Sequence, residues 1–323
     1  MSTITAFMER HFRHFNARET LQAAQAWKQL LDRGGQMFVT LAGAMSTAEL
    51  GKSLAEMIRR DKVHGICCTG ANLEEDIFNL YGQNDYRQIP KYRDLTPEQE
   101  EGLRKETYNR VTDVCIPEGV MLWSDSILVK MWAEAAGKSE PKMPYEFMYD
   151  LLDHPEARGK EHVSREDSWM LAAKEKNLTV FSPGWEDSTL GNMYCAKVME
   201  GAIKGHGGVK TGTQQMEALA GWYRERSEAG TPVGFFQIGG GIAGDFSICV
   251  VPMLIQDCKQ KDTPYWSYFC QITDATTSYG GYSGAPPNEK ITWHKLEPGT
   301  PRFLIQSDAT IVAPLIFAYV LGM

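Results

Sequence analysis

The chain lacks features that would each point to a particular class of protein. Its seven cysteines form no CxxC pair and its seven histidines no HExxH motif, which argues against a disulfide framework and a zinc site. No stretch reaches the roughly 18 apolar residues of a membrane-spanning helix, and the N-terminus lacks the apolar segment of a signal peptide. We therefore expect no metal, no membrane association and a reducing, cytoplasmic location.

Positive charge is also scarce. The 323 residues include 33 Lys and Arg against 41 Asp and Glu, so the formal net charge is −8. A nucleic-acid-binding surface needs an excess of Lys and Arg to displace counterions, and this composition excludes one. A hydrophobic content of 43% is enough for a large core. We expect a folded protein whose acidic surplus permits a cationic small-molecule partner.

Short apolar strands alternate with amphipathic helices in the first and last parts of the chain. Residues 36–44 and 63–70 have the pattern of buried strands, and a helical pattern follows each of them. Further strands are predicted at 178–183, 231–241, 265–273 and 301–306. This alternation favours a parallel sheet with helices on its faces. We predict an α/β fold with a Rossmann-like, doubly wound, mostly parallel sheet flanked by helices.

The middle of the chain has a different pattern. Residues 83–165 are mainly helical, with helices predicted at 96–110 and 118–137 among others. Residues 1–35 have the pattern of a helical lead-in to the first strand. Because we find no internal repeat and no linker, we predict a single domain over residues 1–323 with a helical insertion at 83–165.

Residues 239–244 read GGGIAG and match the GxGxxG pattern between an apolar strand and a helix. Glycines at such a turn let the backbone approach a pyrophosphate at the positive end of the helix. The same pattern also arises from packing alone, so by itself it is weak evidence. Asp274 ends the next predicted strand and is a candidate for the acid that binds a ribose.

Small and polar residues follow other predicted strands. Open α/β sheets bind ligands outside the carboxyl ends of their strands, although each such residue could equally be only a helix N-cap. The candidates are Thr69, Asp187, Thr189, Ser307 and Asp308. The acidic triplet at 74–76 begins a predicted helix, where it fits either a solvated face that offsets the helix dipole or a contact with a ribose or an ammonium.

Lys295 follows a segment rich in Gly, Ser, Thr and Pro at 274–290, which is too long for a simple connector. A lysine beside an aromatic residue such as Trp293, in a site of low polarity, can lose its proton and form an imine. The plainer interpretation is an exposed loop lysine. His294 is either a general base or a structural residue.

The segment SYGGYSGAPPNEKITWHK at 278–295 resembles the active-site signature of deoxyhypusine synthase, in which Gly-Ser-Asp-Ser-Gly-Ala is followed by Glu and then Ser-Trp-Gly-Lys. Four more blocks resemble that family in the same order, at 69–76, 181–192, 239–241 and 306–315. The resemblance extends from about residue 36 to the end of the sequence. It implies a homotetramer of Rossmann-like subunits with active sites at the subunit interfaces.

The resemblance also implies NAD-dependent aminobutyl transfer. NAD takes a hydride from spermidine, an active-site lysine captures the imine, and the aminobutyl group passes to an acceptor amine. Lys295 corresponds to the imine-forming lysine and Trp293 to an aromatic wall, while Glu289 and Ser283 correspond to residues that line the amine tunnel. The residues that correspond to the NAD site are Thr69, Glu75, Asp187, Thr189, Gly239, Gly240, Gly241, Ser307 and Asp308.

The chain departs from the signature around the amine. Tyr282, Tyr279 and Asn192 each stand where the family has Asp, Asp245 stands where it has a proton-transfer His, and His294 replaces a Gly. Fewer carboxylates leave fewer partners for an ammonium, and tyrosine rings suit a guanidinium. We predict catalytic roles for Asp245 and His294 beside the lysine, with the two tyrosines and Asn192 binding substrate.

These residues favour an aminobutyl or guanidinobutyl transferase that acts on small polyamines or guanidino-amines. Its substrates would be spermidine, putrescine or agmatine, and its product would be of the homospermidine type. One alternative is a true deoxyhypusine synthase that modifies a protein lysine. The other is a non-catalytic NAD-binding homologue.

Overall fold

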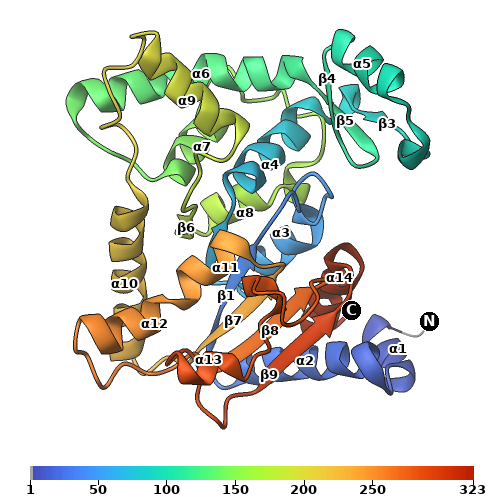
Figure 1. Ribbon diagram of the computed structural model, residues 1–323, viewed down its shortest axis with the longest axis vertical. Coiled ribbons are helices and arrows are strands. Elements are labelled where there is room, and N and C mark those ends of the chain that lie inside the picture. The colour runs from blue at the N-terminus through green and yellow to red at the C-terminus, as the bar shows by residue number, and fades with distance from the viewer. Residues whose placement is uncertain (1–2) are drawn as a thin grey trace.

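The computed structural model describes residues 3–323, and its centre is a six-stranded parallel sheet (Figure 1). The strands are β1 (Gln36–Leu41), β2 (Gly65–Cys68), β6 (Val180–Phe181), β7 (Val233–Ile238), β8 (Tyr268–Thr273) and β9 (Arg302–Gln306). They pair in the order β6-β2-β1-β7-β8-β9. This is a doubly wound order that reverses between β1 and β7, so the predicted fold class is confirmed.

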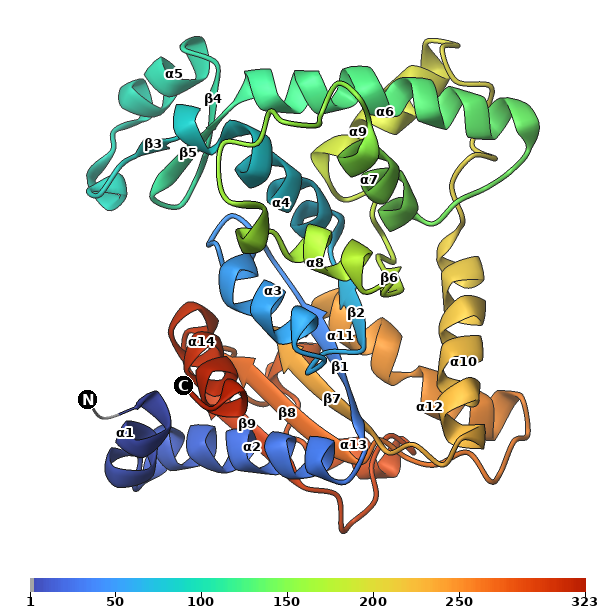
Figure 2. The same cartoon turned by 180° about the vertical axis from the view of Figure 1, so that it is seen from behind.

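Both faces of this sheet are covered by helices (Figure 2). One face carries α2 (Phe15–Asp32), α3 (Gly51–Arg59) and α14 (Ala309–Leu321), and the other carries α10 (Gly212–Glu228) and α11 (Gly241–Ile248). The alternation of side chains along β7 explains how one strand serves two cores. Phe236 belongs to the hydrophobic cluster of the first face and Phe235 to that of the second. A strand buried on both faces is expected to be apolar throughout, as β7 nearly is.

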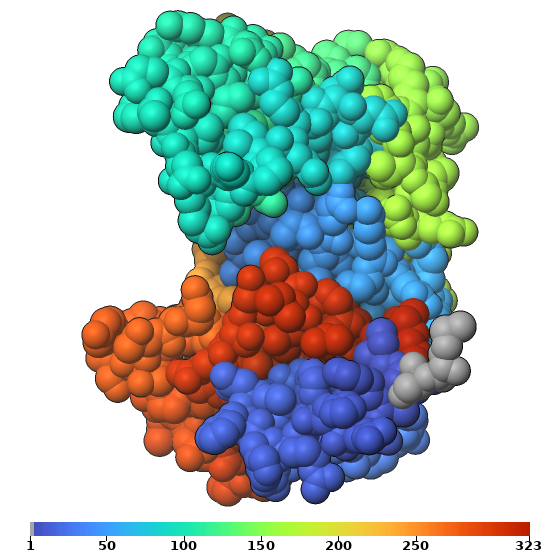
Figure 3. Space-filling view, turned by 90° about the vertical axis from the view of Figure 1, so that its right-hand side faces the viewer, coloured from blue at the N-terminus to red at the C-terminus, as the bar shows by residue number. Residues whose placement is uncertain are grey.

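The other end of the molecule is mainly helical. Its helices are α4 (Gly70–Gly82), α5 (Pro97–Lys105), α6 (Glu118–Lys138), α7 (Pro144–Asp153), α8 (Trp169–Glu175) and α9 (Thr189–Met199). Figure 3 shows residues near 100 at this end, standing beyond α14 and the first helices. This region contains the helices predicted within 83–165. It belongs to the same chain as the parallel sheet.

A small antiparallel sheet in this region was not predicted. Its strands β3 (Arg87–Gln88), β5 (Val114–Pro117) and β4 (Tyr108–Val111) pair in that order. The helix predicted over 96–110 ends at Lys105, because Thr107 adopts a φ of +62° and the chain then turns into β4. Strands as short as these leave almost no alternating pattern in a sequence.

The helical segment after the glycines is divided near Pro252. α11 ends at Ile248, α12 covers Val250–Pro252, and a π-helical turn follows at Met253–Asp257. Proline has no N–H to donate to the Ile248 carbonyl. The indole N–H of Trp266 donates to that carbonyl instead, at 3.1 Å. The sequence pattern over 242–259 indicates a single helix with a kink at this proline, whereas the structure has three helical pieces.

The lead-in at residues 1–35 contains α1 (Ile4–His11) before α2, and residues 1 and 2 of the predicted range lie outside the described part. The last short helix, α13 (Glu289–Thr292), precedes Lys295. Within residues 3–323, no helix is both long and apolar enough to cross a membrane.

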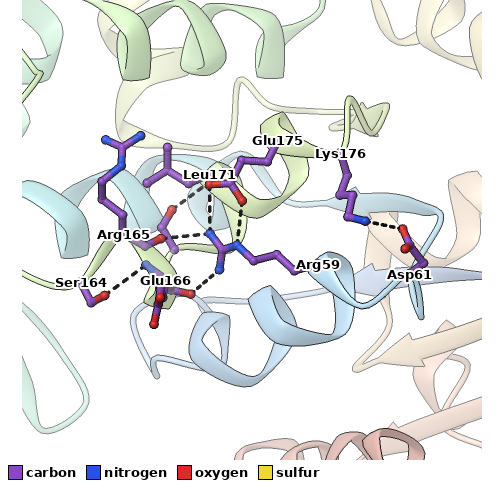
Figure 4. A network of polar contacts seen from close by, with 9 residues as sticks. Arg59, Asp61, Ser164, Arg165, Glu166, Leu171, Glu175 and Lys176 are labelled. Carbon is purple, nitrogen blue, oxygen red and sulfur yellow. Dashed lines mark hydrogen bonds and ion pairs between the residues drawn. The ribbon is translucent and has the colours of Figure 1, made fainter.

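A polar network fixes α8 against α3 (Figure 4). Arg59 pairs with Glu175 at 2.7 Å and donates to carbonyls of the turn at Arg165–Asp167. Lys176 pairs with Asp61 at 2.7 Å. These contacts fix the end of α8 and the turn before it against the end of α3.

Candidate functional site

The carboxyl ends of four parallel strands open onto a cavity of about 440 Å³. It lies where the strand order reverses between β1 and β7, which is the position at which doubly wound sheets bind ligands. The residues after these strands that line it include Ala42, Gly43, Gly239, Asp274, Ser307 and Asp308. Four of the residues predicted for the dinucleotide site thus lie around one cavity.

The glycine turn after β7 has a conformation that requires glycine. Gly239 and Gly241 adopt φ values of +72° and +60°, and a Cβ on Gly239 would lie 2.9 Å from that of Ala42. A Cβ on Gly240 would lie 1.8 Å from Oγ of Ser283. Gly240 is also the N-cap of α11, and it supplies no side-chain acceptor to the first turn. Such a helix start suits an anion.

Two buried glutamines attach the 274–290 segment to this turn. Gln237 donates to the Gly239 carbonyl at 2.9 Å and accepts from the Tyr282 hydroxyl at 2.9 Å. Gln271 donates to the Ser283 carbonyl at 2.9 Å. Neither glutamine was among the predicted site residues. A polar residue within each otherwise apolar strand was the signal that could have found them.

Lys295 and Asp245 are in direct contact. The Lys295 Nζ lies 3.1 Å from Asp245 Oδ1, and the lysine side chain is 9% exposed against 51% for the aspartate. The ring of Tyr282 lies beside the pair, with its centroid 5.6 Å from the nitrogen. A buried lysine with a half-exposed carboxylate and an aromatic ring is an arrangement that can hold a cationic amine and exchange its proton.

Two further residues of this cluster were not predicted. Cys249 lies one helical turn after Asp245, with its Sγ 3.5 Å from the same carboxylate oxygen. Burial raises the pKa of the Cys249 thiol. Lys290 is buried in α13 beside Tyr282, and its burial, with a smaller effect of Lys295, lowers its pKa to about 8. The spacing of four from Asp245 could have revealed the cysteine.

His294 occupies a position that favours glycine. Its φ is +56°, in the left-handed region, which agrees with the glycine of the signature at this point. Its Nδ1 lies 3.4 Å from the hydroxyl of Tyr265. Tyr265 therefore fixes the imidazole ring of His294. The left-handed backbone conformation of His294 sets the direction in which the chain continues to Lys295.

Other residues predicted around the amine lie on the surface of the chain. Trp293 is 66% exposed and Tyr279 is 85% exposed. Glu289 and Asn192 are also exposed, and the Asn192 amide donates to backbone carbonyls of its own loop. Large aromatic side chains left open to solvent in one chain are typical of surfaces that a partner covers.

The predicted solvated face of acids on α4 is wrong, because all three carboxyl groups are buried. Glu74 accepts from the backbone N–H groups of Thr189 and Leu190, at 3.0 and 2.7 Å, at the start of α9. Burial raises the pKa of Glu74 to about 7. The carboxylate offsets the dipole of a neighbouring helix, not that of its own.

Its two neighbours have similar positions. Asp76 accepts from the Ser168 hydroxyl at 2.5 Å and the Met170 N–H at 3.1 Å, at the start of α8. Glu75 accepts from the Thr47 N–H at 3.2 Å. Burial raises the pKa of Asp76 to about 6 and that of Glu75 to about 7. In this chain Glu75 bonds to backbone just beyond the cavity wall.

The remaining predicted cofactor residues lie around the cavity at different distances. Thr69 caps α4, and its hydroxyl donates to the carbonyl of Gly43, a residue that lines the cavity. Asp187 is exposed on the loop before α9. That loop passes close to α11, because a Cβ on its Gly184 would lie 2.9 Å from the Ile242 side chain. Thr189 is exposed at the start of α9.

The sequence model of the deoxyhypusine synthase family matches residues 5–320. The chain belongs to the deoxyhypusine synthase family. A deoxyhypusine synthase-like protein of Thermosynechococcus vestitus is 28% identical over 99% of this chain and 79% of its own length. A probable deoxyhypusine synthase 1 of Archaeoglobus fulgidus is 26% identical over 95% of this chain and 90% of its own. The predicted family is therefore confirmed.

A solved structure supports the fold. A protein of Entamoeba histolytica, assigned provisionally as a deoxyhypusine synthase, superposes with a TM-score of 0.58 at 12% identity, covering 98% of this chain and 92% of that one. Deoxyhypusine synthases are transferases, so the chain belongs to a family of transferases. The signature that led to the family contains Lys295, which the fold places beside the glycine turn.

Proposed function

We propose that this chain is an NAD-dependent transferase of small amines, which moves an aminobutyl or guanidinobutyl group through an imine on Lys295. The observation that carries this proposal is the contact of Lys295 with Asp245 and Tyr282, on a segment bonded to the glycine turn. Spermidine, putrescine and agmatine are the proposed substrates, with a product of the homospermidine type.

The cavity at the strand ends supports NAD as the cofactor. A volume of about 440 Å³ is in the range of cofactor sites, and its glycine turn leads into a helix start without a side-chain cap. The first turn of α11 would hold the pyrophosphate, and the carboxylates of Asp274 and Asp308 would accept from ribose hydroxyls. Bound NAD would supply the acceptor for a substrate hydride and later return it.

Lys295 acts as the nucleophile in this proposal. Its free amine attacks the imine carbon of the oxidised substrate, and a bond from that carbon to Nζ forms as the bond to the departing amine breaks. With spermidine the departing amine is 1,3-diaminopropane. An acceptor amine then attacks the same carbon and Lys295 leaves with its bonding pair. The lysine is regenerated and the acceptor carries the butyl group as an imine, which the hydride returned from the bound cofactor would reduce to the alkylated amine.

Asp245 moves the protons of these steps. Lys295 must be neutral to attack, and the carboxylate 3.1 Å away can accept the proton that it loses. Since Asp245 is half-exposed, that proton can exchange with water. When a substrate ammonium approaches, the same carboxylate can hold it.

The ring of Tyr282 supports a flat or weakly hydrated cation as substrate. Its hydroxyl is fixed by Gln237 at 2.9 Å, so the ring has a defined orientation beside Lys295. A guanidinium stacks on such a face better than an ammonium does. This favours agmatine among the three amines.

We propose that a second subunit completes the amine pocket. Trp293 and Tyr279 are 66% and 85% exposed, and both belong to the segment that carries the lysine. Aromatic residues are enriched at subunit interfaces, and members of this family act as oligomers. The homotetramer therefore stays our prediction.

The test is to incubate the purified protein with NAD and each amine, alone and in pairs, and to identify products by mass spectrometry. Borohydride added during turnover should fix a butyl adduct on the peptide containing Lys295. Lys295→Ala should lose product formation by at least about a thousandfold, because Lys295 supplies the imine nitrogen in this proposal. Lys204→Ala, at an exposed loop lysine, is the matched control and should retain activity.

Two results would reject the proposed function. Product that persists in Lys295→Ala would mean that the imine mechanism is wrong. If no amine gives a product and no adduct is trapped, the non-catalytic alternative holds. Transfer of label from spermidine to a protein lysine would instead identify a true deoxyhypusine synthase.

A further inference from the structure

Lys290 is a buried cation without an acceptor. It is 3% exposed, and among residues 3–323 no atom accepts a hydrogen bond from its Nζ. The nitrogen lies 4.8 Å from the ring centroid of Phe269 and 5.1 Å from that of Tyr282. Aromatic faces attract a cation but do not replace its hydration, so this position costs free energy. A charge buried at a cost in folding free energy points to a role for that charge.

The position of Lys290 relative to Lys295 indicates what this role is. The Tyr282 ring is shared, since the Lys295 nitrogen lies 5.6 Å from the same centroid. The backbone N–H of Lys295 donates to the Lys290 carbonyl at 3.0 Å, which fixes the spacing of the two residues. Two like charges beside one ring in a buried site repel each other, and the low dielectric there makes this repulsion larger than it would be in water.

The charged groups around the pair are few. Asp245, on α11, bonds to Lys295. Glu289 is exposed beside Lys290, and the Cys249 thiol and the Tyr282 hydroxyl are neutral partners of Asp245 and Gln237. Burial and the charge of Lys295 lower the pKa of Lys290 to about 8, so Lys290 is still mainly charged at neutral pH.

We propose that Lys290 is a positioning residue whose buried charge opposes protonation of Lys295. This rests on the proposed role of Lys295 as nucleophile. In the free site Asp245 compensates the Lys295 charge. When a substrate ammonium engages the exposed side of Asp245, Lys295 loses that compensation while Lys290 remains. The Lys295 proton then passes to Asp245 and on to water, which leaves the free amine.

The test measures Lys295 without cofactor or substrate. The protein is treated with formaldehyde and cyanoborohydride from about pH 6 to about pH 11, and methylation of each lysine is followed by peptide mass spectrometry. Lys290→Met removes the charge and keeps the length of the side chain. Since Lys290 carries its charge mainly below about pH 8, we expect methylation of Lys295 in this variant to slow about tenfold near pH 7 and to change little above about pH 9.

Lys290→Arg keeps the charge and should keep the wild-type labelling rate of Lys295 near pH 7, which a merely structural role for the side chain would not require. Lys290→Met should also melt at a temperature no lower than wild type, because it removes an unpaired buried charge. If Lys290→Met does not fold, Lys290→Gln replaces it in the same titration. A labelling rate near pH 7 that is unchanged by loss of the charge, or slowed equally in Lys290→Arg, would overturn the inference.

The two proposals can fail separately. The labelling assay needs neither NAD nor an amine substrate, so its result stands even if no transfer activity is found. If transfer occurs, Lys290→Met should lower kcat near and below pH 7, where Lys290 is charged, and leave KM for the amine within about twofold. Turnover with an unchanged kcat near pH 7 would contradict the role of Lys290 and leave that of Lys295 intact.

Discussion

Asp245 is the residue whose charge most directly affects the Lys295 amine. In Asp245→Asn the lysine keeps its place in the fold but loses its counter-charge, because Asn can still accept one hydrogen bond. We expect methylation of Lys295 near pH 7 to become several-fold faster. Turnover with the preferred amine should nevertheless fall roughly a hundredfold, because the group that receives the proton is gone.

The opposite signs of these two effects make the prediction specific. Asp257→Asn, at an exposed carboxylate beyond Pro252, is the matched control and should change neither rate. If labelling and turnover both fell in Asp245→Asn, the variant would have disturbed the position of Lys295. A role for Asp245 in proton transfer would then lose its support.

For single residues, the sequence predicts which side chains are reactive better than it predicts which side chains surround them. Lys295 and Asp245 were predicted from the signature and an ungapped alignment, and they are in contact. Lys290 lies in the same segment but has the pattern of an exposed loop lysine. Its burial depends on Phe269, a residue of another strand, and only the folded chain brings the two together. Local pattern contains no such information.

At the scale of the elements, the turn between β7 and α11 is where the 274–290 segment contacts the rest of the site. Gly240→Ala would place a Cβ 1.8 Å from Ser283 Oγ and 3.1 Å from its Cα. The 274–290 segment must then move away from α11, and the bond of Tyr282 to Gln237 lengthens with it. We expect a loss of turnover of at least about a hundredfold and weaker binding of NAD, measured by steady-state kinetics and by calorimetric titration.

Gly221→Ala provides the contrast for that substitution. Gly221 lies inside α10, and a Cβ there would meet nothing within 4 Å. Alanine favours helix by about 1 kcal/mol over glycine, so this variant should melt higher and keep its activity. Full activity in Gly240→Ala would show that the segment does not need to touch the turn.

Strands of the parallel sheet were predictable because each is an apolar run with a helix after it. The antiparallel strands β3, β4 and β5 were not, because they are short and half-exposed. Residues 47–61 have a helical pattern after the first strand, but the helix begins only at Gly51. Ser46 and Thr47 bond to Asn72 and Glu75 of α4 instead of continuing a helix. Contacts between distant segments decided these boundaries.

Across the whole molecule, the three buried acids of α4 connect the sheet to the far helices. Glu74 has a pKa raised from its ordinary 4.5 to about 7 by burial. A carboxyl group with a raised folded pKa binds its proton more tightly in the folded state, so its contribution to stability is full below pH 4.5 and is lost as the pH rises through 7. We expect the free energy of unfolding to fall between about pH 5 and about pH 8, by about 3 kcal/mol for Glu74.

Urea denaturation at several pH values measures this dependence. Glu74→Gln should flatten it, because glutamine does not titrate, whereas Glu217→Gln at an exposed position of α10 should leave it unchanged. A stability that increases from pH 5 to pH 8 in the wild type, with the same slope in Glu74→Gln, would mean that these acids stay ionised in the fold.

The 274–281 stretch has a consequence for how such a protein can diverge. These residues are mostly exposed and belong to neither hydrophobic cluster, yet they lead directly into Tyr282 and the two lysines. Changes there cost little folding free energy, since no core packing is lost. Under the proposed function, selection can therefore exchange one continuous piece of coding sequence and alter the amine specificity, while the sheet and the glycine turn are inherited intact.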